Sequence, residues 1–396
     1  MISVVLCGVG GFGQTYAKAL LAGAKEHDIQ WVGAVEPFPD RVWCKDEIDA
    51  AGVPWYGSLE AFYREQAADL CVIATPIGLH APQSIFALNQ GSHVLCEKPA
   101  AALPRDLDAM AAARNAAGKI LAIGFQQSYS QAVLRIKQDI LDGLYGKPLR
   151  LRTRALWPRD HAYFSRGSGW AGKVKDASGN WALDSIANNA AAHYLHNMLY
   201  VLGQPGCAAL PDTMQAVLAR ANPIEMYDTA FLRMELGGAV LSFIGTHAGA
   251  DNEGIHSRYE FEHGDVVFVR NTQGPSRWVG TLNDGRTIEY GDPAGDPALL
   301  WKIVAHLRGQ GSAVLPCDIV TAMPHNRAMI AALLSAEIKT MPGAVDDGTR
   351  FFISGLDEQC RICDQEQRLP TQSDAPWAEP GKTVQLDDPR IGTYGT

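Results

Sequence analysis

The glycine-rich turn Gly8-Val9-Gly10-Gly11-Phe12-Gly13 restricts the fold of this chain more than any other feature. It follows an apolar run, Ile2–Cys7, that predicts a buried strand, and it opens a helical pattern over Phe12–Lys25. At such a junction, glycines permit the tight turn, let the backbone approach a pyrophosphate and let the helix pack closely on the strand. The N–H groups and the dipole at the start of the helix favour phosphate binding. The candidate phosphate-binding residues are therefore Gly8, Gly10, Gly11, Phe12 and Gly13.

The rest of residues 1–125 alternates short apolar runs with helical stretches such as Leu103–Ala117. Continuous apolar strands separated by helices are typical of a parallel sheet that is covered on both faces. We therefore predict an N-terminal doubly wound α/β domain, a Rossmann domain, over residues 1–125. Its further strands are expected at Trp31–Val35, Asp69–Thr75, His93–Cys96 and Ile120–Gly124.

The end of the second predicted strand carries an acidic residue, Glu36, about 23 residues beyond Gly13. A carboxylate at this place hydrogen-bonds the ribose hydroxyls of NAD and repels the 2′-phosphate of NADP. No arginine directly follows Glu36, and the nearest one is Arg41. The sequence therefore predicts NAD as the cofactor, with NADP as the less favoured alternative.

The pattern changes after residue 125. Gln131–Leu144 predicts a linking helix, and residues 149–154 alternate strictly, as in a strand with one solvated face. Strand-like runs then cluster without a helix between each pair, so we predict a second, α+β domain over residues 126–396 with a mostly antiparallel sheet. Further strands are expected at Thr229–Glu235, Ala239–Thr246, Arg258–Glu262 and Val266–Arg270, and helices at Ala187–Leu202, Pro297–Leu307 and Ile319–Ile338.

Two parts of this second domain are expected at its surface. Arg150, Arg152 and Arg154 share one face of the alternating strand, which indicates a solvated sheet face or a subunit contact more than a ligand site. From about Thr371 the chain is polar and contains Pro and Gly, which is typical of an extended tail.

Composition excludes several classes of function. The 396 residues carry a net charge of −9 and show no concentrated basic stretch, which argues against nucleic-acid binding. No apolar run approaches the roughly 18 residues that cross a membrane, and the N-terminus lacks the basic start of a signal peptide, so we expect a cytoplasmic protein. Among eight cysteines, Cys360 and Cys363 form a CxxC pair without a second pair of ligands, so no metal site is expected.

The motif Glu97-Lys98-Pro99 follows the fourth predicted strand, and Ala74-Thr75-Pro76 follows the third, with His80 four residues beyond. Together with the glycine turn, these motifs closely resemble the Gfo/Idh/MocA oxidoreductases, a family that includes inositol dehydrogenases. The resemblance implies an open-faced sheet in the second domain, and a substrate held between the domains over the nicotinamide. It implies that Lys98 binds the reacting hydroxyl and stabilises a developing alkoxide. It also implies that Thr75, Pro76, His80, Glu97 and Lys98 line the cofactor cleft.

The segment Asn188–Asn197 carries a second group of candidate residues. His193 matches the family histidine, which is the usual base, and an ordinary pKa of roughly 6.5 suits proton abstraction near neutral pH. Family members commonly carry a carboxylate four residues earlier, where this chain has Asn189, and an amide cannot accept that proton. Asp184 either takes the missing role or positions and caps the helix. A metal pair of His193 and His196 lacks a third ligand.

A third segment, Trp157–Lys173, interleaves aromatic residues with Arg, Gly and Ser. Aromatic rings stack on sugar faces, and cationic groups bind hydroxyls or an anionic substituent. The segment is either a loop over a sugar site or a surface loop packed by its own rings. In the first case Arg159, Arg166 and Lys173 indicate an acidic, sulfonated or phosphorylated sugar. The candidate substrate-binding residues are Arg159, Arg166, Trp170, Lys173, Asp184 and His196.

These residues favour an NAD-dependent oxidoreductase that moves a hydride between the nicotinamide and a hydroxyl of a sugar, sugar acid or cyclitol. The catalytic candidates are Lys98, His193, Asn189 and Tyr163. The alternative is an NAD-dependent glycosidase that works by transient oxidation, elimination, hydration and re-reduction with no net redox change. A third possibility is a non-catalytic regulator on the same fold. The expected partners are a carbohydrate-like small molecule and further copies of the chain, in a homodimer or homotetramer, because an open-faced sheet leaves a surface to cover.

Overall fold

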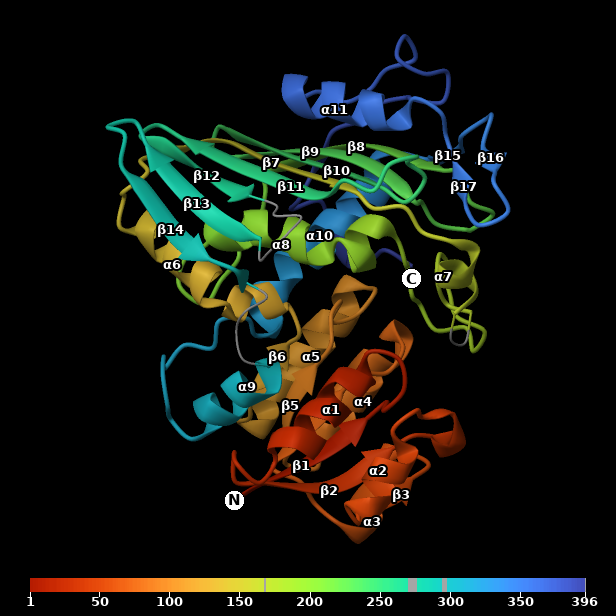
Figure 1. The fold of residues 1–396 in the computed structure, drawn as a ribbon, viewed down its shortest axis with the longest axis vertical. Helices are drawn as coiled ribbons and strands as arrows, with labels where there is room; N and C mark the ends of the chain where they lie inside the picture. The colour runs from red at the N-terminus through yellow and green to blue at the C-terminus, as the bar shows by residue number, and fades with distance from the viewer. Residues whose placement is uncertain (167–168, 270–275, 294–297, 396) are drawn as a thin grey trace. The chain divides into compact units, whose positions relative to one another are not determined.

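A computed structural model describes residues 1–166, 169–269, 276–293 and 298–395. The chain forms two compact units (Figure 1). Unit 1 holds residues 1–125 together with a later segment that ends at Ala322, and unit 2 holds the rest of the chain. The first boundary lies between Phe125 and Gln126, directly after the last strand of the first sheet.

Unit 1 is built on a six-stranded parallel sheet with the strand order β3-β2-β1-β4-β5-β6. This is the order of doubly wound dinucleotide-binding domains, so the predicted Rossmann fold is confirmed. Its central strands are apolar throughout because helices cover both faces of the sheet, and Val4, Val5 and Leu6 are fully buried. The strands are β1 (Ile2–Cys7), β2 (Ile29–Val35), β3 (Trp55–Tyr56), β4 (Leu70–Ile73), β5 (His93–Cys96) and β6 (Leu121–Ile123).

Local signals in the sequence set the ends of the unit 1 helices. The side chain of Ser58 caps α3 by accepting a hydrogen bond from the backbone N–H of Ala61. α5 begins at Pro104, whose missing N–H is not needed in a first turn, and it ends at Gly118 in the left-handed conformation. The helices are α1 (Gly13–Gly23), α2 (Lys45–Ala50), α3 (Leu59–Glu65), α4 (Ile77–Asn89) and α5 (Pro104–Ala117).

One late segment packs in unit 1, although the division at residue 125 assigned it to the second domain. α9 (Leu299–Leu307) carries Trp301, whose ring stacks on His27 with centroids 4.1 Å apart. Further along, Asp318 forms a salt bridge of 2.7 Å with Arg114. Contacts so distant in sequence leave no periodic signal, which is why the pattern of apolar residues could not predict them.

Unit 2 contains a ten-stranded sheet with β14-β13-β12-β11-β7-β10-β9-β8-β15 in order, and β18 also pairs with β8. Its neighbours are antiparallel except for the pairs β7–β10 and β8–β15. The predicted α+β domain with a large, mostly antiparallel sheet is therefore confirmed. The strands are β7 (Pro148–Leu156), β8 (Thr213–Arg220), β9 (Thr229–Leu236), β10 (Ala239–Thr246), β11 (Gly254–Phe261), β12 (Gly264–Val269), β13 (Arg277–Leu282), β14 (Thr287–Gly291), β15 (Ile338–Thr340) and β18 (Val384–Gln385).

Helices lie on both faces of this sheet (Figure 1). On one face, α6 (Gln131–Leu141) contacts β14 and α8 (Ala192–Val201) contacts β7. On the other face, α11 (Leu356–Glu366) contacts β7 and β10. Most of the long helix α10 (Ile319–Ser335), from Met323 onward, also belongs to unit 2.

The arginine face of β7 lies partly beneath α11. Arg154 is only 8% exposed and forms salt bridges of 3.0 Å with Glu253 and 3.5 Å with Asp364. Arg150 remains exposed and pairs with Glu260 at 3.2 Å. The expected solvated face or subunit contact is therefore wrong for Arg154, because a helix from the C-terminal part of the chain covers it.

The C-terminal part is also packed, so the expected extended tail after Thr371 is wrong. Trp377 and Ala378 join an apolar cluster beneath α11 that also contains Cys360 and Cys363, and β18 adds to the sheet edge. Both cysteines of the CxxC pair are thus core residues. Within the described ranges, no three or more His, Cys, Asp or Glu side chains are grouped to hold a metal, and no helix is long and apolar enough to cross a membrane.

Candidate active site

The glycine turn in unit 1 is shaped by two close backbone approaches. A Cβ on Gly13 would lie 1.8 Å from the carbonyl oxygen of Gly8, so only glycine lets α1 pack on the turn. Gly8 itself has a φ of +81°, and a Cβ there would meet Ala74 and Thr75 at 2.8 Å. Gly11 has a φ of +52° and open space around it. The turn therefore presents bare backbone where α1 begins, which fits the phosphates of a dinucleotide.

The carboxylate of Glu36 lies against this turn at the end of β2. Its Oε2 accepts a hydrogen bond of 3.3 Å from the backbone N–H of Gly10, and its Oε1 accepts one of the same length from Phe38. Phe38 is 57% exposed, and the guanidinium of Arg41 lies 4.7 Å from its ring centroid. The sequence analysis did not single out Phe38; its only signal is an apolar side chain two residues beyond Glu36.

Glu97 connects the Lys98 loop to α1 in the interior of unit 1. Its Oε1 accepts a hydrogen bond of 2.6 Å from the hydroxyl of Tyr16, and its Oε2 accepts one of 3.1 Å from the backbone N–H of Lys98. Burial raises the pKa of Glu97, although the Tyr16 hydrogen bond opposes the rise. A Cβ on Gly124 would lie 2.9 Å from the carboxylate, so the end of β6 is shaped to admit this side chain. Glu97 is thus a positioning residue for Lys98.

His80 holds together the loops that follow β4 and β5. It is buried on α4, with Nδ1 2.8 Å from the carbonyl oxygen of Pro99 and Nε2 2.7 Å from that of Thr75. A neutral imidazole can donate to only one of them. Burial nevertheless lowers the pKa of His80, while both carbonyl contacts act in the opposite direction. Pro76 directly precedes α4, so this histidine supports the loop that carries Thr75 and Pro76.

In unit 2 the predicted helix over residues 187–202 is divided in two. Residues Ile186–Ala190 form a π-helical turn capped by Ser185, and α8 begins only at Ala192. The backbone N–H of Ala191 donates to the carbonyl of Ile186, five residues earlier, at 2.8 Å. This turn therefore departs from the regular i, i+4 spacing that would place Asn189 and His193 on one face of a helix. The wider turn changes the angle between them.

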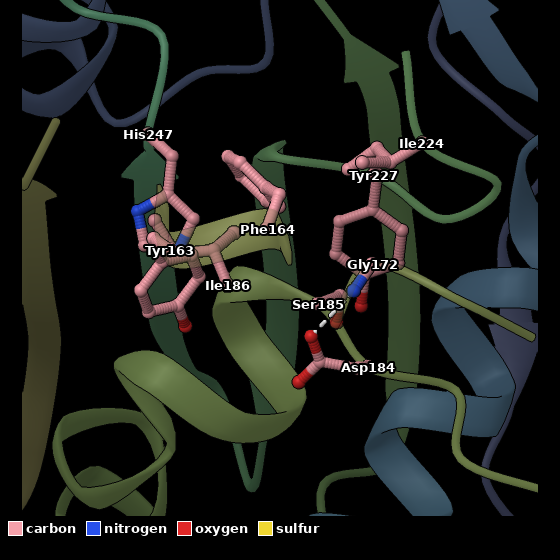
Figure 2. Close-up of a pocket in the computed structure, with 9 residues that line it drawn as sticks. All are labelled: Tyr163, Phe164, Gly172, Asp184, Ser185, Ile186, Ile224, Tyr227 and His247. Carbon is pink, nitrogen blue, oxygen red and sulfur yellow. Dashed lines mark hydrogen bonds between the residues drawn. The ribbon is translucent and has the colours of Figure 1, made fainter. Parts of the chain in front are cut away.

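Asp184 is the buried carboxylate that holds this turn. Its Oδ1 accepts a hydrogen bond of 2.8 Å from Nδ2 of Asn189, and its Oδ2 accepts one of 2.7 Å from the backbone N–H of Gly172 (Figure 2). Ser185, not Asp184, provides the helix cap. The structure thus gives Asp184 the positioning role that the sequence analysis left open.

Tyr163 lies beside this carboxylate in the aromatic loop, within the short helix α7 (His161–Ser165) (Figure 2). Two guanidinium groups lie over its ring, that of Arg166 at 3.5 Å and that of Arg159 at 4.7 Å from the centroid. Burial and the negative charge of Asp184 raise the pKa of Tyr163. At neutral pH its phenol therefore keeps its proton and can donate it. Trp170 completes the group, 5.0 Å from the Arg166 guanidinium.

The ring of His247 lies next to the ring of Tyr163, and their centroids are 5.5 Å apart. Its Nδ1 lies 2.7 Å from the carbonyl oxygen of Trp157, and burial lowers its pKa to about 3. His247 was not among the predicted site residues. Nothing in the local sequence shows that the residues after β7 fold back onto it.

Two of the predicted substrate-binding side chains are engaged elsewhere. Nζ of Lys173 forms a salt bridge of 3.1 Å with Oε1 of Glu225. His196 is fully buried among other residues of unit 2, stacked on Tyr200 at 5.8 Å and 6.4 Å from His325. Burial lowers the pKa of His196 strongly. The substrate-binding assignment of His196 is therefore contradicted, because α8 turns this residue toward the interior.

The structure thus brings the predicted residues together as two groups, each within its own unit. Around the turn at the end of β1 lie Gly8, Gly10, Gly11, Phe12, Gly13 and Glu36, and the supporting loops carry Thr75, Pro76, His80, Glu97 and Lys98. In unit 2, Asp184, Asn189, Tyr163, Arg159, Arg166 and Trp170 form a connected cluster of contacts. His193 follows this cluster at the start of α8.

Comparison with known proteins agrees with this arrangement. Residues 2–125 match the model of GFO_IDH_MocA, an oxidoreductase family with an NAD-binding Rossmann fold. The chain is 33% identical over 142 residues to 1-carboxy-3-chloro-3,4-dihydroxycyclohexa-1,5-diene dehydrogenase of Comamonas testosteroni, covering 35% of each protein. It is 33% identical over 153 residues to 2,7-anhydro-N-acetylneuraminate hydratase of Mediterraneibacter gnavus, covering 37% of this chain and 38% of the hydratase. The matched stretch thus spans little more than a third of either relative.

A solved structure extends the likeness of fold to most of the chain. The WlbA dehydrogenase from Bordetella pertussis, in complex with NADH and UDP-GlcNAcA, superposes with a TM-score of 0.66. The match covers 84% of this chain and 95% of that one, at 23% sequence identity. At this identity the likeness establishes the two-part fold and nothing finer.

Proposed function

This chain belongs, through residues 2–125, to the Gfo/Idh/MocA family of oxidoreductases, and from that premise we propose that it is an NAD-dependent oxidoreductase acting on CH–OH groups of a sugar or cyclitol. The observation that carries the proposal is the pairing of a bare glycine turn with a structured Lys98 loop. The turn fits the phosphates of a dinucleotide. The Glu97 carboxylate accepts a hydrogen bond of 3.1 Å from the backbone N–H of Lys98, which fixes the loop that carries this cation.

The side chains of this chain would then handle the hydroxyl of the substrate. Lys98 donates a hydrogen bond to the reacting oxygen and stabilises its developing negative charge. His193 accepts the hydroxyl proton as the carbon is oxidised. NAD, when bound, supplies the hydride acceptor. Asn189 orients a neighbouring hydroxyl, and its amide is itself fixed by Asp184 at 2.8 Å.

We propose NAD over NADP because of Glu36. Its two oxygens already accept hydrogen bonds from the turn and from Phe38, which keeps a negative charge beside the place of the adenosine ribose. A 2′-phosphate would meet that charge. Replacing Glu36 with Ser removes it, and the ratio of kcat/KM for NAD to kcat/KM for NADP should fall by about tenfold or more.

A second candidate function is the redox-recycling glycosidase or hydratase. It is favoured by Tyr163, a proton donor in contact with two guanidinium groups, and by the likeness to an anhydro-sugar hydratase. In that scheme a ring hydroxyl would be oxidised, a base would remove the proton α to the new ketone, and the leaving group would depart with a proton from Tyr163. Water would then add across the resulting double bond, and the ketone would be reduced back to the hydroxyl. The cofactor would be reduced and reoxidised within one turnover.

One experiment separates the two candidates. Purified protein with NAD is screened against sugars, cyclitols, sugar acids and chromogenic glycosides, while NADH and released aglycone are followed together. NADH that accumulates in proportion to substrate supports the dehydrogenase. Aglycone release without net NADH supports the glycosidase, and absence of both rejects enzymatic action on this class of compound.

Single substitutions test the assigned roles. Lys98→Ala and His193→Ala should each lower kcat by about a hundredfold or more while the fold remains intact. The exposed residues Lys147 and His263 provide matched controls, and their Ala variants should keep full activity. Full activity in both the Lys98 and the His193 variants would show that the catalytic assignment is wrong.

A further inference from the structure

A cavity of about 230 Å³ lies in unit 2 next to the Tyr163 cluster. Two distant segments line it: the loop after β7 and the turn between β16 (Val345–Asp346) and β17 (Phe351–Phe352). Figure 1 shows α7 beside this pair of strands. The side chains that line the cavity are Pro158, Arg159, Asp160, Tyr163 and Arg350.

The two segments are fixed to each other through His161. Its backbone N–H donates to the carbonyl of Thr349 at 2.9 Å, and its Nε2 lies 2.9 Å from Oδ1 of Asp346. Its ring also meets the ring of Phe351, with centroids 5.1 Å apart. Arg350 therefore lies in a hairpin whose residues on both sides of Arg350 contact His161, and this hairpin positions it at the cavity.

Arg159 contributes a cation whose charge is only partly compensated, through electrostatic attraction to Asp160 and a side-chain hydrogen bond with Tyr163. It forms no ion pair with the residues that the structure describes, and its buried Nε has no hydrogen-bond partner among them. The guanidinium stacks over the rings of Trp157 at 4.1 Å and Tyr163 at 4.7 Å. Stacking occupies the faces of a guanidinium and leaves its edge, which carries the N–H groups, for an oxyanion.

Arg350 contributes a second, partly compensated cation. Its Nη2 donates to the carbonyl of Ala250 at 2.6 Å, and its Nε lies 3.7 Å from Oδ2 of Asp347. The carboxylate of Asp347 also accepts the backbone N–H groups of its own turn. The one lining carboxylate, Asp160, caps α7 through the backbone N–H of Tyr163 at 2.8 Å. Two guanidinium groups thus face the cavity against a single carboxylate that is already engaged.

We propose that this cavity is an anion subsite that binds a carboxylate or phosphate group of the substrate. The inference rests on the proposed function, since Tyr163 forms a wall of both the cavity and the candidate active site. It narrows the substrate to an anionic carbohydrate, a sugar acid or a sugar phosphate. The volume exceeds that of several water molecules, at about 30 Å³ each, so it admits either group.

The test is calorimetric binding of three probes to the full chain: glucuronate, glucose 6-phosphate and glucose, at constant ionic strength. The dissociation constants of the anionic probes should be lower than that of glucose by about tenfold or more. Arg350→Gln should reduce that preference by about tenfold and leave glucose binding unchanged, and Arg350→Lys should restore part of it. The exposed, self-paired Arg286 provides the matched control, and Arg286→Gln should behave as wild type.

Equal binding of glucose and both anionic probes would overturn the proposal, as would a preference that survives in the Arg350→Gln variant. Inorganic phosphate is titrated in parallel, because it needs no sugar-binding surface. Binding of phosphate that depends on Arg350, in a protein that oxidises none of the screened compounds, would refute the proposed function and support the anion subsite. A stronger response to one anionic probe identifies whether a carboxylate or a phosphate is preferred.

Discussion

At the scale of single residues, the Asp184–Asn189 pair explains how this chain accommodates an amide at position 189. The family that the chain resembles commonly has a carboxylate at this position. Asp184 is buried and already accepts two hydrogen bonds, one of them from Asn189 at 2.8 Å. An amide donor satisfies that carboxylate, whereas a second carboxylate would repel it. The departure from the family pattern is therefore compensated locally, by a residue five positions earlier.

Asn189→Asp should consequently impair the protein instead of restoring a catalytic acid. Two carboxylates in contact raise the pKa of one of them, so the folded state binds more protons than the unfolded state. The loss of stability relative to wild type should be small near pH 4 and grow as the pH rises to 8. Melting temperatures of both proteins across that range test this, and a difference independent of pH would contradict it.

The buried ring of His247 leads to a second prediction, which concerns the pH dependence of stability. Its pKa of about 3 keeps the buried ring neutral, whereas an unfolded histidine titrates near 6.5. The unfolded state thus binds more protons as the pH falls from about 6.5 toward 3, and this histidine costs stability over that window.

The variant His247→Asn should remove that contribution while its amide can still donate to the Trp157 carbonyl. The melting temperature of wild type should fall more steeply between pH 7 and pH 4 than that of the variant. Parallel curves for the two proteins would mean that the ring takes up a proton in the folded state.

At the scale of elements, the close approach of α1 to the glycine turn predicts a sharp contrast between two glycines. Gly13→Ala forces a Cβ to within 1.8 Å of the Gly8 carbonyl, so it should lower the melting temperature by several degrees and abolish NAD binding. A Cβ at Gly11 has open space around it, so Gly11→Ala should lower the free energy of unfolding only through the strain of its positive φ, by about 1 kcal/mol. Thermal melts and NAD titration distinguish them, and equal effects would contradict the packing argument.

The elements also show what sequence patterns can and cannot predict. The runs Ile2–Cys7 and His93–Cys96 agree with β1 and β5 because buried parallel strands are continuously apolar. β8, β13 and β14 were missed, and the extra width of the turn at Ile186–Ala190 leaves no mark in the residue types. Motifs that are local, such as the glycine turn and Glu36, were found; partners such as Tyr16 for Glu97, 81 positions apart, were not.

At the scale of the whole molecule, the C-terminal residues act as part of the core and not as a tail. Trp377 is 8% exposed and packs against Phe231 of the sheet, with ring centroids 6.3 Å apart. Trp377→Ala should cost about 3–5 kcal/mol of unfolding free energy, measured by chemical denaturation. Trp43, which is 51% exposed, is the control, and Trp43→Ala should cost less than about 1 kcal/mol. Comparable losses in the two variants would restore the tail interpretation.

Long-range packing limited the sequence analysis most at this scale. Composition and the order of apolar runs were enough for the two-part fold, because layer architecture follows from which faces must be buried. They could not show that α9 packs in unit 1, that α11 covers Arg154, or that Arg350 meets Arg159 across a cavity. Each of these depends on contacts between segments far apart in the chain.

The π-helical turn before α8 has a consequence for how such a site can diverge. A turn of this kind corresponds to one residue inserted into an α-helix, and each residue of an α-helix advances it by about 100°. Deleting one codon between Ile186 and Ala191 would therefore rotate His193 by about a quarter of a revolution relative to Asp184, with both of these residues retained. In the proposed reaction, the length of the chain at this point would influence which substrate hydroxyl meets His193, as much as residue identity would.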